Sequence, residues 1–201
     1  MFVLTVDQRG SRGGVDKVPD LLRRTSVPGM VRPFDRTAGD EVQAVFDAPD
    51  HVASLAAELA ASGEWSVGIG VGAVDTPLPA ETRAGAGEAF VFARTAVEDA
   101  KKNRWHLTIA GESASCVHAQ TAGRLLVDVL TDRSDAGREA VALVADGTSQ
   151  ADAAERLGIS PQAISLRLRH ARWDIEPSAV RLFAAALDAA DHHTGASGAR
   201  P

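Results

Sequence analysis

The first 110 residues alternate between short apolar runs and longer segments in which apolar positions recur at helical spacing. Runs of strand length, rich in β-branched and aromatic residues and bounded by Gly, Pro, Asn, Asp or Ser, predict strands. The predicted strands are 2–6, 30–34, 42–46, 65–74 and 105–110. The predicted helices are 15–24, 51–61 and 87–102. This order, β-α-β-β-α-β-α-β, matches an α+β palm of the split βαβ (ferredoxin-like) type.

The strand predicted at 65–74 has an unusual second face. Trp65, Val67 and Ile69 alternate with Ser66, Gly68 and Gly70, and Gly72 follows in the same pattern. An apolar face backed by glycines is typical of a strand that another backbone or a ligand approaches closely. Two interpretations stay open, a helix packed directly on the glycines and a ligand site.

No strand pattern occurs after residue 110. A helix at 114–130 leads to a predicted hinge at 131–135, and everything beyond is helical or polar. We therefore expect an α+β palm followed by an all-α domain. The predicted domains are a palm at 1–112, a connecting helix at 113–132, a helical domain at 135–190 and a disordered tail at 191–201.

Residues 150–169 carry the local chemistry of a helix-turn-helix. Gly158 supplies the left-handed residue that ends one helix. Ser160 is an N-cap and Pro161 takes the first position of the next helix. Ala154 is small, as required where two helices cross closely. Ile164 and Leu168 are expected to face Leu157 and Ile159 in a small core. The segment resembles the winged-helix and sigma-region-4 type regulator families.

The predicted recognition helix, 161–172, would lie in the major groove of double-stranded DNA. Glutamine side chains pair with adenine, and arginine pairs with guanine or phosphate. The candidate DNA-binding residues are Ser160, Gln162, Ala163, Ser165, Leu166, Arg167 and Arg169. The alternative is a helical hairpin that only binds another protein.

Composition and charge narrow the function classes. The net charge of -6 excludes a protein that is basic all over, such as a DNA-coating protein. Residues 149–173 nevertheless hold four arginines against two acids, a local charge of +2. The single cysteine, Cys116, excludes an intramolecular disulfide and a cysteine-rich zinc site. The N-terminus has no basic region before its apolar run, and no apolar stretch reaches the ~18 residues of a membrane span. We expect a cytoplasmic protein without membrane contact.

Two acids of the predicted palm occupy special positions. Asp7 ends the first strand and Asp40 lies in the turn of the hairpin. In a split βαβ palm these positions are adjacent, so the two carboxylates are candidate ligands of a shared divalent cation. The alternatives are purely structural roles, in which Asp7 caps the turn at Ser11 and Asp40 is a turn residue beside Gly39.

A resemblance follows from several segments together. Asp7-Gln-Arg-Gly-Ser11, Gly39-Asp40-Glu41-Val-Gln43, the glycine-rich strand 68–72 and the helix that holds Arg94 resemble the SatD family and, more distantly, the palm of class III nucleotidyl cyclases. The likeness spans roughly residues 1–110. It implies a cyclase-like palm that binds a nucleotide with Mg²⁺; no other cofactor is indicated. The candidate nucleotide- or phosphate-binding residues are Ser11, Arg12, Arg36, Arg94 and Lys101. Ordinary surface ion pairs are the alternative role of Arg94 and Lys101.

The chain departs from the cyclase pattern at its catalytic helix. When Gly87 is aligned with the family glycine, Val91 and Thr95 occupy the positions of the family's asparagine and arginine. Arg94 lies one residue away and points about 100° around the helix. Without a cationic clamp on the transferring phosphate, much of the electrostatic stabilisation is missing. No catalytic residue is assigned, and the departure argues against cyclase activity.

The sequence thus predicts a DNA-binding transcriptional regulator whose palm acts as a sensor, a dimerisation domain or both. A small nucleotide is the effector that the resemblance implies. A homodimer is expected because two-fold pairing doubles the contacts on a palindromic site. The competing hypothesis is a metal-dependent nucleotidyl or phosphoryl transferase with an appended helical interaction module.

Overall fold

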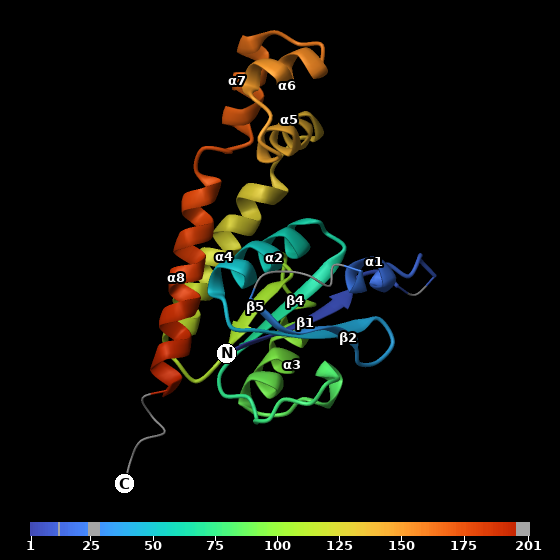
Figure 1. Ribbon diagram of the computed structural model, residues 1–201, viewed down its shortest axis with the longest axis vertical. Helices are drawn as coiled ribbons and strands as arrows, with labels where there is room; N and C mark the ends of the chain where they lie inside the picture. Colours follow the sequence, from blue (N-terminus) through green and yellow to red (C-terminus); the bar gives the residue numbers. More distant parts are fainter. Residues whose placement is uncertain (12, 24–28, 196–201) are drawn as a thin grey trace.

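A computed structural model describes residues 1–11, 13–23 and 29–195 and shows an α+β protein with one mixed sheet (Figure 1). The strand order is β2-β3-β1-β4-β5. Strand β1 is antiparallel to both of its neighbours, β2 is antiparallel to β3, and β5 is parallel to β4. The strands are β1 (Phe2–Gln8), β2 (Met30–Arg36), β3 (Glu41–Phe46), β4 (Trp65–Val71) and β5 (Leu107–Ala110).

Helices cover both faces of this sheet. On one face α3 (Glu88–Ala100) packs against β4, β5 and β1. The other face buries the main apolar core, to which α1, α2, α4 and α8 contribute. Their bounds are α1 (Val18–Leu22), α2 (Pro49–Ala61), α4 (Ser115–Thr131) and α8 (Glu176–Gly195). We call the sheet with these five helices the sheet core.

Helix α3 packs directly on the glycines of β4. A Cβ added to Gly68 would lie 2.3 Å from the amide nitrogen of Val97, and one on Gly70 would lie 2.0 Å from the carbonyl oxygen of Ala89. No side chain fits where backbone approaches so closely. The interpretation of a closely packed helix is therefore confirmed, and Gly68 and Gly70 do not face a ligand site.

The connections around α2 and α3 have opposite hands. Strands β3 and β4 are parallel to each other, as are β4 and β5, and both connections step the same way across the sheet. Nevertheless α2 and α3 lie on opposite faces. Almost all connections between parallel strands of one sheet are right-handed, so one of these two connections is an exception. Here the segment 72–87 first reaches β2, where Arg32 donates to the carbonyl of Pro79 at 2.6 Å, and this detour carries the chain to the other face.

The chain then leaves the sheet core and builds a second, smaller apolar cluster. Helices α5 (Asp135–Ala145), α6 (Gln150–Arg156) and α7 (Pro161–His170) pack on one another beyond the ends of α4 and α8 (Figure 1). We call them the three-helix unit. Its buried residues are Ala140, Val141, Ala153, Ala154, Ile164, Leu168 and Ala171.

Helix α8 corrects the predicted domain limits. We expected 135–190 to form one helical domain, but Phe183 and Leu187 of α8 are fully buried in the sheet core, between α2 and α4. The aromatic ring of Phe183 would lie 2.8 Å from a Cβ added to Gly123 of α4, so the two helices meet closely there. Apolar periodicity shows that a helix buries one face, but it does not identify the surface that covers that face.

The predicted start of a disordered tail at residue 191 is wrong as well. Helix α8 continues to Gly195, and the carboxylate of Asp191 pairs with the N-terminal amine of Met1. The rest of the predicted tail, 196–201, lies outside the described residues. Within the described ranges, no helix has both the length and the hydropathy that a bilayer crossing needs.

Candidate functional site

The connection between α6 and α7 has the geometry that its sequence predicts. Gly158 adopts a positive φ of 63°, which side chains disfavour. The hydroxyl of Ser160 accepts a hydrogen bond from the amide of Ala163 at 3.2 Å, and Pro161 begins α7. Ser149 caps α6 in the same way, accepting from the amide of Asp152 at 3.1 Å. These local bonds fix the directions in which the two helices start.

Helix α7 presents one continuous exposed face. Gln162, Leu166 and Arg169 follow one another at spacings of four and three residues, and all three are exposed. Ile164 and Leu168 are buried on the opposite face. Leu166, at the centre of this polar face, retains 48% of its accessible surface.

The other predicted DNA-binding residues lie differently. Arg167 turns toward α5, where its Nη1 lies 3.5 Å from the carboxylate of Glu139. The Ser160 hydroxyl is engaged as the helix cap, and Ala163 is half-buried. Ser165 is exposed, with its hydroxyl donating to the carbonyl of Pro161 at 3.1 Å. Five of the seven candidates are therefore exposed, namely Ser160, Gln162, Ser165, Leu166 and Arg169.

A second candidate site lies at the end of β1 in the sheet core. Two pockets of about 290 and 350 Å³ adjoin there and share Gln8, Ser11 and Asp40. The first pocket is lined further by Gly14, Asp16, Arg36 and Gly39, and the second by Asp7, Gly10 and Lys101. We call the two pockets the β1 cleft. Five predicted residues thus meet in one place: Asp7, Ser11, Arg36, Asp40 and Lys101.

Two predicted phosphate-binding residues remain, Arg94 and Arg12. Arg94 is exposed on α3 and lines neither pocket. Arg12 lies outside the described residues. Sequence reasoning missed Gln8, which is buried and holds the following loop. Its side chain donates to the carbonyl of Val15 at 2.7 Å and accepts from the amide of Lys17 at 2.8 Å.

The charges of the β1 cleft are largely paired within the protein. The Nζ of Lys101 lies 2.9 Å from the carboxylate of Asp7 and 2.8 Å from that of Glu98. Burial by itself would lower the pKa of Lys101, but hydrogen bonds to Glu98 and Asp7 outweigh it and raise that pKa. An ammonium group thus neutralises the carboxylate that we expected to bind a cation.

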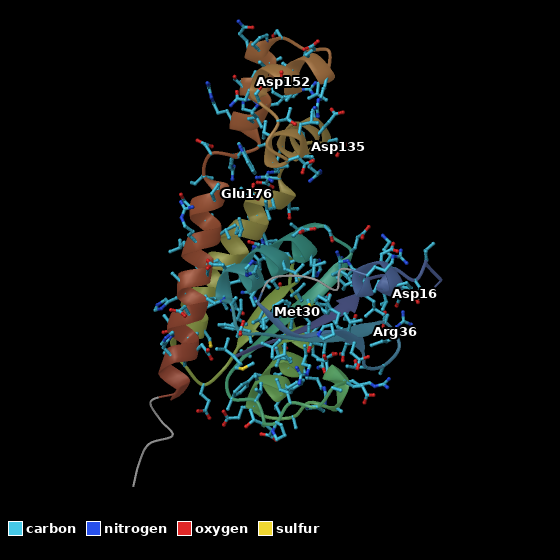
Figure 2. All side chains as sticks on the ribbon, in the orientation of Figure 1. Asp16, Met30, Arg36, Asp135, Asp152 and Glu176 are labelled. Atoms are coloured by element: carbon cyan, nitrogen blue, oxygen red, sulfur yellow. The ribbon has the colours of Figure 1, made fainter. Side chains whose placement is uncertain are left out.

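Arg36 is held in the same manner. Its Nη2 lies 2.9 and 2.7 Å from the two carboxylate oxygens of Asp16, and the two side chains are labelled close together at the edge of the sheet in Figure 2. This hydrogen bond lowers the pKa of Asp16. Asp7 and Asp40 line the same pocket, yet the described residues contain no group of three or more His, Cys, Asp or Glu side chains that would hold a metal ion. A cation at this place would have only two protein carboxylates.

Comparison with known proteins identifies no relative. The chain matches no protein-family model, no curated protein and no solved structure. The resemblances to the SatD family, to class III cyclases and to helix-turn-helix regulators therefore stay predictions. The function is argued from the geometry of the two sites.

Proposed function

We propose that the protein is a DNA-binding transcriptional regulator in which α6 and α7 form a helix-turn-helix and α7 lies in the major groove. The observation that carries the proposal is the exposed face of α7, where Gln162, Leu166 and Arg169 stand in one row. This face belongs to a small unit that projects from the sheet core (Figure 1). A projecting helix meets the groove without a clash from the rest of the molecule.

The three side chains suit the edges of base pairs. Gln162, near the start of α7, matches the donor and acceptor of adenine, and Arg169 matches guanine or a phosphate. The exposed methyl groups of Leu166 suit the methyl group of thymine. Arg156, His170 and Arg172 are exposed on the same unit and add contacts to phosphates.

The sheet core takes the role of sensor in this proposal. The arrangement β2-β3-β1-β4 is antiparallel throughout and supports the cyclase-like palm that the SatD resemblance implies. Lys101 and Arg36 are the cationic side chains of the β1 cleft, and a small nucleotide with Mg²⁺ would bind there by exchanging their pairs with Asp7 and Asp16 for its phosphates. The competing transferase has weaker support, because the three carboxylates of the cleft, Asp7, Asp16 and Asp40, do not form a group that could hold a metal ion within the described residues.

A homodimer completes the proposal. A single unit with a local charge of +2 provides modest affinity, whereas two units double the contacts. Leu125 of α4 and Leu182 of α8 are 60% and 61% exposed, and they lie on helices that pack side by side. We infer that these two leucines contribute to the contact with a second copy. Light scattering at micromolar concentration is expected to give the mass of a dimer.

DNA binding is tested with a duplex selected by the wild-type protein from a random pool, with affinity measured by fluorescence anisotropy. Arg169→Ala should weaken binding about tenfold or more, because a base contact contributes ~1–3 kcal/mol. Arg167→Ala should have a smaller effect, since Arg167 pairs with Glu139. Arg181→Ala, an exposed change on α8, is the matched control and should leave affinity unchanged. Wild-type affinity in a variant lacking Gln162, Leu166 and Arg169 side chains would refute the proposal.

A further inference from the structure

A cavity lies at the junction of the sheet core and the three-helix unit. Its volume is about 750 Å³, within the range of small-molecule sites. Residues of α2, α4 and α8 form its walls, and the start of α5 closes one end. The apolar part of the wall consists of Ala57, Ala61, Leu126, Leu130 and Val180.

Two arginines bring positive charge to the end nearest α5. The side chain of Arg133 is only 7% exposed, and its Nε donates to the carbonyl of Ala171 at 2.8 Å. Its Nη2 pairs with Glu176, which is labelled in Figure 2 at the start of α8. Arg138 is 52% exposed, and its ion pair with the fully exposed Asp135 is long, at 3.5 Å. Arg138 therefore keeps donors for another acceptor.

We propose that this junction cavity binds a small organic carboxylate with an apolar body and that its occupancy changes the position of α7. The carboxylate contacts Arg138 and Arg133, and the apolar body packs on Leu126, Leu130 and Val180. Glu58 lines the α2 wall, so the anionic group is directed to the arginine end. The regulatory half of the inference rests on the proposed DNA-binding function, whereas the binding half does not.

The coupling follows from the contacts of Arg133. This residue follows α4, the carbonyl that it binds belongs to the residue after α7, and Glu176 begins α8. One side chain thus joins both segments that link the three-helix unit to the sheet core. A ligand carboxylate replaces Glu176 on Arg133 without leaving the buried guanidinium unpaired. Glu176 is then released from Arg133. The linkers thus have two arrangements, one with the Arg133–Glu176 pair and one without it, and these differ in ligand affinity, as regulation requires.

Binding is tested with octanoate, with 1-octanol as its neutral counterpart, and with 8-anilinonaphthalene-1-sulfonate as a fluorescent anionic probe. The full-length protein should enhance the fluorescence of the probe saturably, and octanoate should displace it at least tenfold more effectively than 1-octanol. Arg138→Glu should weaken probe and octanoate binding about tenfold or more, since it reverses the charge at the arginine end. Arg94→Glu, an exposed change on α3 away from the cavity, is the control and should bind both as the wild type does.

Leu130→Trp is a second variant, which keeps both arginines and fills the apolar part of the cavity. Octanoate should therefore also fail to displace the fluorescent probe from this variant. Equal binding by the wild type, Arg138→Glu and Leu130→Trp, or equal displacement by octanoate and 1-octanol, would overturn the inference. In the presence of saturating octanoate, the affinity for the selected duplex should change about fivefold or more. An unchanged affinity would overturn the regulatory half. A protein that binds octanoate but no duplex would refute the proposed function and leave the site standing.

Discussion

The sheet core and the three-helix unit obtain their structures in different ways. In the three-helix unit, short-range bonds at Ser149, Gly158 and Ser160 set the helix starts and ends, and a small cluster around Ile164 holds the helices together. In the sheet core, strands distant in sequence pair, and helix α8 packs from the far end of the chain. Local chemistry therefore accounts well for the structure of the three-helix unit and only in part for that of the sheet core.

The same contrast appears in the polar groups. In the β1 cleft, Asp7 pairs with Lys101 and Asp16 pairs with Arg36. On α7, by contrast, Arg169 has no ion pair within the described residues, and Gln162 is exposed. Groups already paired gain less from a ligand, because an existing interaction must be exchanged. The exposed face of α7 is thus better prepared for a large partner than the cleft is for a small one.

Breaking the packing of the sheet core should have the largest effect. Gly70→Val places a side chain where the backbone of Ala89 and Ala93 lies within 2.0 and 2.4 Å. Helix α3 must move, so the free energy of unfolding should fall by about 3 kcal/mol or more, measured by urea denaturation with circular dichroism. Gly72→Ala, at the residue that follows β4, meets only ordinary contacts at 3.4 Å and serves as the control. A Gly70→Val variant as stable as that control would contradict the close packing.

A change in the second cluster should destabilise the three-helix unit alone. Ile164→Ala should lower the free energy of unfolding of this unit by about 2 kcal/mol. This is the lower end for such truncations, because a small cluster collapses readily into the gap that the truncation leaves. The fluorescence of Trp173, which packs on this cluster, reports the unit, whereas Trp65 is buried in the sheet core. With Trp65 and Trp105 replaced by Phe, the midpoint of the Trp173 transition should fall. An equal fall in the circular dichroism of the sheet core would show that the two regions unfold together.

The smallest effect concerns the pH dependence of the sheet core. Burial, and then the charge of Arg9, lower the pKa of His106, whose Nδ1 is buried without a hydrogen-bond partner. Because the folded pKa lies below the unfolded value of about 6.5, protonation favours the unfolded chain, and stability should fall as the pH drops below about 6.5.

His106→Asn tests this dependence. Asparagine also tolerates the positive φ of 50° at this position, so stability at pH 7.5 should change by no more than about 0.5 kcal/mol. The urea midpoint of the variant should fall less than that of the wild type between pH 7.5 and 5. His192, whose pKa is raised by Asp188, acts in the opposite direction and is present in both proteins. Identical losses in the two proteins would exclude His106 as the cause.

The order of strands and helices in the first 110 residues could be predicted from the sequence, as could the break between α4 and α5 and the caps of α6 and α7. These features depend on periodicity and on contacts between residues a few positions apart. The candidates Asp7, Asp40 and Ser11 could also be brought together, because in a split βαβ palm the end of the first strand lies beside the turn of the hairpin.

Other features depend on contacts between distant segments, and only the tertiary structure decided them. The apolar face of α8 is visible in the sequence, but its burial against α2 and α4 is not. The pairings of Lys101 with Asp7 and of Arg167 with Glu139 require the approach of helices whose positions no local pattern determines. The junction cavity around Arg133 likewise exists only where α2, α4 and α8 meet the start of α5, since short-range signals set the conformation of each helix and long-range packing sets what lies between them.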